Sequence, residues 1–255
     1  MRGTGSAGRE VPDCTSRLPP ESDLQQPLEP PAIAWPPAGD WPDRLREHGA
    51  LHMRGVPLDA DNGSLRSLGA QLGHPSLRAI DRGLDEGEGV QRVQPLSMPV
   101  NDRFGKSLIS AGHGEFALHT DQSFLDRPAR FVLLHCWQPA PAGGITRLAD
   151  SRAIAASVDR VEWIAWTQLR LPYPCGDRCS LESGVVRFNA SECAASLSAT
   201  QRSWLARFTG SLERIACETR LASGDLLLLD NRRMLHGRTA FDAASGRLLK
   251  RLRIR

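Results

Sequence analysis

The segment His119-Thr120-Asp121 places an imidazole and a carboxylate two residues apart in the sequence. In an extended strand, residues i and i+2 point to the same face and lie about 6.6 Å apart at Cα, so both side chains can reach one metal ion. Histidine nitrogen and carboxylate oxygen are common ligands of divalent metals. A pair of this kind also occurs as a hydrogen-bonded surface pair, so a metal site requires a further ligand.

His236 can supply that ligand, because it follows the apolar segment 225–231, which predicts a buried strand. A lone histidine after a strand is commonly a hydrogen-bonded core residue, and the combination with His119 and Asp121 changes this interpretation. Two imidazoles and one carboxylate on one face leave coordination positions open. This is the pattern of non-haem Fe(II) oxygenases and differs from a closed structural site.

Arg247 lies eleven residues after His236 and begins the segment 247–255, which predicts a terminal strand. The strand alternation places Arg247, Arg251 and Arg253 on one face. A buried guanidinium requires an anion, and its planar fork suits a carboxylate. A charged edge strand that prevents aggregation gives the same pattern. This segment alone leaves both interpretations open.

The composition of the 255-residue chain is that of a soluble globular protein, with 40% hydrophobic and 24% charged residues. Lys and Arg number 32 against 29 Asp and Glu, which gives a net charge of only +3 and argues against a dedicated nucleic-acid binder. No apolar run approaches the roughly 18–20 residues of a membrane span, and the first residues lack the apolar core of a signal peptide. We therefore expect a cytoplasmic protein that binds neither nucleic acid nor membrane.

The ligands must be positioned by a sheet, because strands dominate both ends of the predicted domain. Gly and charged residues in segment 78–115 predict a loop over a site. Together the patterns predict one mixed domain built around an antiparallel sheet or barrel. The expected strands are 48–59, 129–137, 185–189, 225–231 and 247–255, and the expected helices are 61–73, 151–166 and 198–218.

The N-terminal segment is rich in proline: eight of the 18 prolines lie between Pro12 and Pro37. Apolar periodicity is absent there, which predicts a flexible leader over residues 1–35 and a single folded domain over residues 36–255. A proline-rich ligand for a partner protein is the alternative interpretation. Deletion of residues 1–35 distinguishes the two.

Taken in order, four motifs make the chain resemble the Fe(II)/2-oxoglutarate-dependent dioxygenases. Within these enzymes the chain is similar to the taurine dioxygenase (TauD/TfdA) and clavaminate synthase-like family. The resemblance covers about residues 119 to 253, with weaker support from segment 48–59. The motifs are HTD (119–121), GGITRLAD (143–150), GDLLLLDNRRMLHGRTAF (224–241) and RLLKR (247–251).

The resemblance implies His119, Asp121 and His236 as iron ligands. Thr146 and Arg247 match the residues that hold the distal carboxylate of 2-oxoglutarate. Arg251 matches a second arginine, which in relatives contacts the cosubstrate or an anionic group of the substrate. The matching positions also include Asn231 and Arg238, which we expect to support the loop around His236.

The family fold is a double-stranded β-helix, or jelly roll, with flanking helices, so the resemblance implies a mixed α/β fold that is mainly β. The implied cofactors are Fe(II), the cosubstrate 2-oxoglutarate and O₂. The implied reaction is hydroxylation of an unactivated C–H bond of a small polar metabolite, an amino acid or a natural-product intermediate, with release of succinate and CO₂. Desaturation and epoxidation use the same oxidant. Asp121 argues against halogenation, because halogenases of this type lack the carboxylate.

Two other protein classes fit parts of the pattern. A catalytically degenerate jelly-roll binding protein keeps the fold without turnover, but loss of a metal ligand would mark it and all three are present. A zinc hydrolase can use the same His/Asp/His set, but it has no need of a dicarboxylate clamp such as Arg247 with Thr146. The sequence leaves the oligomeric state and the identity of the small-molecule substrate open.

Overall fold

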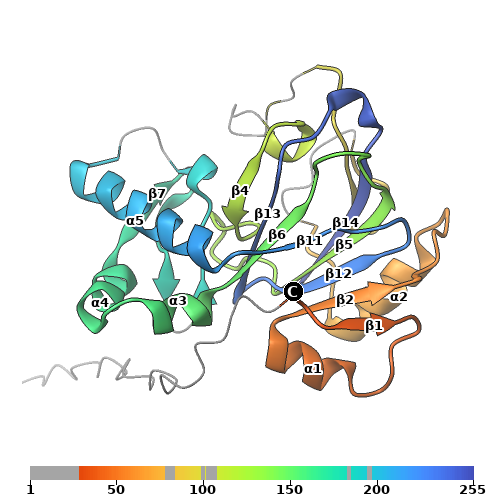
Figure 1. The fold of residues 1–255 in the computed structure, drawn as a ribbon, viewed down its shortest axis with the longest axis horizontal. Helices are drawn as coiled ribbons and strands as arrows, with labels where there is room; N and C mark the ends of the chain where they lie inside the picture. The colour runs from red at the N-terminus through yellow and green to blue at the C-terminus, as the bar shows by residue number, and fades with distance from the viewer. Residues whose placement is uncertain (1–28, 78–83, 99–100, 102–107, 183–184, 194–196) are drawn as a thin grey trace, which may run out of the picture.

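The computed structural model describes residues 29–77, 84–98, 101, 108–182, 185–193 and 197–255. The fold mixes helices and strands and is mainly β, with two larger sheets and a group of helices beside the second sheet (Figure 1). Within these ranges, none of the helices combines the length and the apolar character that a membrane span requires.

The first sheet has six strands and forms one wall of the molecule. Only β1 and β2 run parallel, and every other neighbouring pair is antiparallel. The alternating side chains of this sheet enter two separate cores. In spatial order the strands are β1 (Ala32–Ala34), β2 (Ala50–Arg54), β12 (Leu226–Asp230), β5 (Phe131–Gln138), β14 (Leu248–Ile254) and β3 (Val90–Val93).

Two helices cover the outer face of this sheet: α1 (Trp41–His48) and α2 (Gly63–Leu72). Their buried residues, such as Leu45 and Leu68, pack in one apolar cluster with the outward-facing residues of the sheet. The inner face contributes Leu134, Leu227 and Leu249 to another cluster, which faces the second sheet. The sheet is therefore held rigidly from both sides.

The second sheet has four antiparallel strands and carries the candidate metal ligands. Its buried residues Leu148 and Met234 join the inner cluster of the first sheet, so the two sheets pack face to face. In spatial order the strands are β11 (Cys217–Thr219), β6 (Thr146–Asp150), β13 (Met234–Arg238) and β4 (Phe116–His119).

A third core lies beside the second sheet, around the aromatic residues Trp166, Phe188 and Phe208. Phe208 packs edge-to-face against both of the other rings, at centroid distances of 5.2 Å from Trp166 and 4.7 Å from Phe188. The surrounding elements are α3 (Ser151–Ser157), α4 (Arg160–Gln168), α5 (Ala199–Ile215) and the strand pairs β7 (Arg170–Tyr173) with β8 (Gly176–Cys179) and β9 (Leu181–Glu182) with β10 (Val185–Val186). The short 3₁₀ turns are η2 (Ile109–Ala111), η3 (Ala190–Glu192) and η4 (Ala243–Ser245).

The helix expected over 198–218 is present as α5, but it ends at Ile215 because Cys217–Thr219 form β11. The start of α5 has a local cause. Ser198 and Gln201 form a capping box, in which each side chain bonds the backbone N–H of the other residue. The single helix expected over 151–166 is wrong. Val158 adopts an extended conformation and ends α3, and the Asp159 carboxylate accepts a hydrogen bond from the Glu162 N–H at the start of α4. The helical spacing of apolar residues continues past this cap, so that spacing alone does not show where α3 ends and α4 begins.

The segment 78–115, which the sequence predicts as a loop, contains the strand β3 and the turn η2. The strand pairs with β14, placing Gln91 opposite Arg251. The sequence of β3 does not show the usual alternation of apolar and polar residues, because the polar residue Gln91 is almost completely buried. The prediction fails here because the polar residue is held by a partner far along the chain.

The predicted leader, residues 1–35, overlaps the described chain only from residue 29 onward, and its last part contains β1. β1 extends the first sheet beside β2. Ile33 and Trp35 pack against the outer core, and the Trp35 N–H donates to the Arg54 carbonyl at 2.9 Å. Residues 31–35 are thus attached to the first sheet, since the Pro31 carbonyl also accepts from the His52 N–H.

We expect a chain lacking residues 1–35 to melt about 4–8 °C below a chain lacking only residues 1–28. The longer deletion removes β1 and two half-buried apolar side chains, which together contribute about 2 kcal/mol. Thermal unfolding followed by circular dichroism compares the two truncated chains directly. Equal melting temperatures would show that β1 does not stabilise the sheet.

Candidate metal centre

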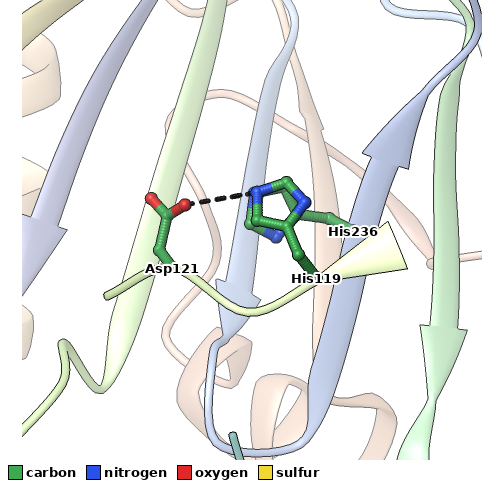
Figure 2. Close-up of side chains that lie close together, drawn as sticks. All are labelled: His119, Asp121 and His236. Carbon is green, nitrogen blue, oxygen red and sulfur yellow. Dashed lines mark ion pairs between the residues drawn. The ribbon is translucent and has the colours of Figure 1, made fainter. Parts of the chain in front are cut away.

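His119 and His236 are brought together by the pairing of β4 with β13. His119 is the last residue of β4, and the antiparallel register places His236 directly opposite it. Asp121 follows on the segment that leaves β4, and Figure 2 shows its carboxylate turned toward the imidazoles. The three side chains, 117 positions apart in sequence at the extremes, therefore meet because of one strand pairing.

Gly237 permits this close pairing. A Cβ on Gly237 would lie 2.6 Å from the carbonyl oxygen of Phe116 in β4, closer than any real contact of this kind. The register of the two strands also shifts between His236 and Arg238, which marks a bulge or irregularity beside the ligand. The glycine in the motif HGR is therefore required by the neighbouring backbone.

The candidate ligand atoms lie within 4.8 Å of one another. The Nε2 atoms of His119 and His236 are 3.5 Å and 3.7 Å from Asp121 Oδ1. All three side chains are buried. Among the described residues, this is the group of histidine, cysteine and acidic side chains whose geometry suits a metal ion.

The surroundings of the two histidines suit metal binding. His119 Nδ1 lies 2.9 Å from the Ala117 carbonyl, which can only accept, so Nδ1 is the donor of this contact and Nε2 is the atom that faces Asp121. Burial, together with the nearby His119, lowers the pKa of His236 to about 3, so this imidazole is neutral. His236 Nδ1 is buried without a hydrogen-bond partner in the described chain.

Asp121 is held as a carboxylate by two arginines of β14. Burial alone would raise its pKa, but Arg251 and Arg253 outweigh this effect and hold the pKa of Asp121 well below its usual range. Arg253 Nε donates to Asp121 Oδ2 at 2.7 Å, and Arg251 Nη1 lies 3.3 Å from the same oxygen. A buried anionic ligand is thus available beside two neutral imidazoles.

The backbone of Asp121 is fixed by Asn231, which lies between β12 and β13. The Asn231 side-chain oxygen accepts from the Asp121 N–H at 2.8 Å, and its amide nitrogen donates to the carbonyls of Asp121 and Ala129 at 3.0 and 2.8 Å. We expected Asn231 to support the His236 loop. The bonds it makes instead anchor the carboxylate ligand.

Thr146 and Arg247 line a pocket between the two sheets that is also lined by His119, His236 and Arg251. The Arg247 side chain is buried and lies with its guanidinium carbon 5.1 Å from the centroid of the Phe241 ring. Burial lowers its pKa. In the described part of the chain, no carboxylate lies within ion-pair distance of Arg247. A buried cation of this kind is suited to an external anion.

The Gly143-Gly144 turn makes room for this arginine. Both glycines have positive φ angles, of 68° and 60°. A Cβ on Gly144 would lie 3.1 Å from Arg247 Nε, and one on Gly143 would lie 2.1 Å from the Ala240 carbonyl oxygen. The GG-x-T motif therefore brings Thr146 and Arg247 to the same pocket by keeping the turn free of side chains.

The remaining predicted residues lie close to the site in different ways. Arg251 lines the pocket, as expected of a residue that contacts a ligand, but it also pairs with Asp121. Arg238 donates to the carbonyls of Gly112 at 2.6 Å and Ile109 at 3.2 Å, and so ties β13 to the segment before β4.

The sequence analysis missed two residues of the centre, Arg253 as a partner of Asp121 and Gln91 as a partner of both arginines. Strand alternation had placed Arg253 on the same face as Arg251, and this was a usable signal. Gln91 gave no signal, because its strand was predicted as a loop.

Comparison with known proteins identifies one family and several similar folds. The family described as "Taurine catabolism dioxygenase TauD, TfdA family" matches residues 31–163 and 180–253. No curated protein matches the sequence.

Among solved structures, the PvcB protein from Pseudomonas aeruginosa is 22% identical with a TM-score of 0.65, and the match covers 98% of this chain and 95% of PvcB. An asparagine oxygenase in complex with Fe(II), 2S,3S-3-hydroxyasparagine and succinate is 19% identical, with a TM-score of 0.62 and coverage of 81% and 74%. The non-heme iron oxygenase OrfP in complex with Fe and alpha-ketoglutaric acid is also 19% identical, with a TM-score of 0.62 and coverage of 85% and 80%. These similarities show a shared fold.

We expect Gly237→Ala to weaken divalent-metal binding by about tenfold or more and to lower the melting temperature, because the added methyl group forces β4 away from β13. Co(II) titration followed by visible absorption and thermal unfolding measure the two effects. Gly114→Ala is the matched control, since a Cβ there meets nothing within 4 Å. If both variants bind Co(II) like the wild type, the tight pairing at Gly237 does not position the ligands.

Proposed function

Because the chain belongs to the TauD/TfdA family of taurine catabolism dioxygenases, we propose that it is an Fe(II)- and 2-oxoglutarate-dependent oxygenase of a small polar metabolite. The observation that carries the proposal is the buried group of His119, Asp121 and His236, whose ligand atoms lie within 4.8 Å of one another. Two imidazoles and one carboxylate leave three positions of an octahedral metal open, as a non-haem iron oxygenase requires.

In this proposal, His119, His236 and Asp121 would hold Fe(II). The protonation states fit the metal: His236 is neutral and Asp121 is anionic. When bound, Fe(II) with 2-oxoglutarate and O₂ supplies the oxidation of an unactivated C–H bond, with succinate and CO₂ as co-products.

Arg247 and Thr146 would hold the distal carboxylate of 2-oxoglutarate. The supporting observation is that Arg247 is buried in the pocket of the two histidines and has no carboxylate partner in the described chain. A guanidinium can donate two parallel hydrogen bonds to a carboxylate, and a threonine hydroxyl can donate a further one. OrfP, a solved structure with a similar fold, contains Fe and alpha-ketoglutaric acid.

The other lining residues orient the substrate and exclude water. Val93, Leu134 and Leu249 give one side of the pocket an apolar surface. Arg251 also lines the pocket and would contact the cosubstrate or an anionic group of the substrate. A dry pocket strengthens these charged contacts and protects the reaction from solvent.

For the substrate we propose an amino acid or a natural-product intermediate, and for the reaction hydroxylation. Two solved structures with similar folds support this class, since that of an asparagine oxygenase contains 2S,3S-3-hydroxyasparagine and that of OrfP contains (3R,4R)-dihydroxy-L-Arg. Asp121 occupies the position that a halogenase leaves without a carboxylate, which favours oxygen transfer over halogenation. Desaturation and epoxidation remain alternatives within the same oxidative chemistry.

We further propose that the two larger sheets are the walls of a double-stranded β-helix, with the helices as flanking elements. Their face-to-face packing around one shared core supports this interpretation. We also propose that residues from 36 onward belong to a single domain, with β1 as an added edge strand.

We expect His119→Ala and His236→Ala to reduce succinate formation below detection, because each removes one of three metal ligands. The protein is first loaded with Fe(II) and 2-oxoglutarate without oxygen, and the visible charge-transfer band is recorded. Succinate is then measured after O₂ is admitted. This assay is run with and without a panel of amino acids that includes asparagine and arginine. The exposed His74, changed to Ala, is the control. Wild-type turnover in either ligand variant would contradict the assignment, and a folded, metal-loaded wild type without band or succinate would favour a binding protein.

We expect Arg247→Ala to raise the 2-oxoglutarate concentration for half-maximal succinate formation by about 10- to 100-fold, since a hydrogen-bonded ion pair is lost. Fe(II) affinity should stay unchanged, and Arg247→Lys should recover part of the loss. Arg46→Ala, a substitution of an exposed arginine on α1, is the control. An unchanged 2-oxoglutarate requirement would mean that another residue binds the distal carboxylate.

A further inference from the structure

The two oxygens of the Asp121 carboxylate lie in different surroundings. Oδ1 is the oxygen nearer to the imidazoles, 3.5 Å from His119 Nε2 and 3.7 Å from His236 Nε2 (Figure 2). Oδ2 accepts from Arg253 Nε at 2.7 Å, whereas Arg251 Nη1 lies between the two oxygens, 3.3 Å from Oδ2 and 3.5 Å from Oδ1. Only one oxygen is therefore directed to the place where a metal ion would bind.

The arginines that hold Oδ2 are themselves anchored by Gln91 of β3. Gln91 Oε1 accepts from Arg251 Nη2 at 2.8 Å and from Arg253 Nη1 at 3.1 Å. Gln91 is 1% exposed, so this oxygen is shielded from water. A single amide thus connects both guanidinium groups, and its position is set by the pairing of β3 with β14.

The carboxylate is restrained at both ends. Asn231 fixes the backbone of Asp121 through two hydrogen bonds, and Arg253 holds the outer oxygen. Rotation of the carboxylate to present both oxygens to a metal would break the bond between Arg253 Nε and Oδ2. Such a broken bond in a buried site leaves a charged donor unpaired, which is unfavourable.

The positive charge of Arg253 should by itself weaken metal binding. A guanidinium beside the ligand oxygen repels a divalent cation, and it also withdraws negative charge from that ligand. Its electrostatic effect is therefore to weaken metal binding. Its geometric effect is the opposite, because an oriented ligand binds more tightly than one that must be ordered. The two effects predict opposite results when Arg253 is removed.

We propose that Arg253 is a positioning residue for the metal centre. Together with Arg251 and Gln91, it keeps Asp121 as a one-oxygen ligand and holds Oδ2 away from the metal. A two-oxygen carboxylate would occupy one of the three positions that the oxygenase reaction needs for 2-oxoglutarate and O₂. The inference rests on the proposed function, and it adds a role for a residue that does not itself bind the metal.

The test is a Co(II) titration of the metal-free full chain, with Arg253→Met as the variant. We expect Co(II) to bind about 10- to 100-fold more weakly than to the wild type, with a change in the visible absorption of the bound ion. Arg253→Lys keeps the charge and one donor group and should recover part of the affinity. Arg255→Met, which removes a neighbouring arginine bonded to Ser76 and not to Asp121, is the control and should bind Co(II) like the wild type.

Binding of Co(II) by Arg253→Met that equals or exceeds the wild type, with the same absorption, would overturn the proposal, because only the electrostatic effect would then be present. If Arg253→Met does not fold, the proposal is tested with Arg253→Lys and Gln91→Met instead. Both should shift the Co(II) absorption and weaken binding, and wild-type behaviour in both would also overturn the proposal. Failure of the wild type to bind Co(II) would contradict the proposed function itself, which separates the two outcomes.

Discussion

The metal centre depends on one strand pairing, that of β4 with β13. This pairing places His236 opposite His119, although the two residues are far apart in the sequence. The close approach at Gly237 makes the pairing specific, because a side chain there would collide with the backbone of Phe116. The rest of the site follows from it: Asp121 leaves the end of β4, and the pocket opens between this sheet and the first one.

Buried charge is the second constraint on the site. Asp121 and the guanidinium groups of Arg251 and Arg253 lie together in a region shielded from water, where each needs the others. Arg247 is buried nearby without such a partner in the described chain, so the pocket has an excess of positive charge. A dianion such as 2-oxoglutarate would correct this imbalance when it binds.

The first sheet provides the rigid support for these charges. Its inner face carries Arg251 and Arg253, while its outer face is covered by α1 and α2 over a continuous apolar core. β14 lies between β5 and β3, so its backbone cannot shift without breaking hydrogen bonds on both sides. An arginine on a central strand is a more precise anchor for a ligand than one on a loop.

The sequence by itself determined the local features: the capping box of α5, the same-face spacing of His119 with Asp121, and the alternation of the arginines on β14. These depend on neighbours only a few residues apart. Tertiary structure alone decided which groups the arginines meet, because Asp121 lies 132 positions before Arg253 and Gln91 lies 160 positions before Arg251. It also decided that β3 is a strand. These outcomes depend on strand pairing and burial between segments that are distant in the sequence, so local residue patterns do not predict them.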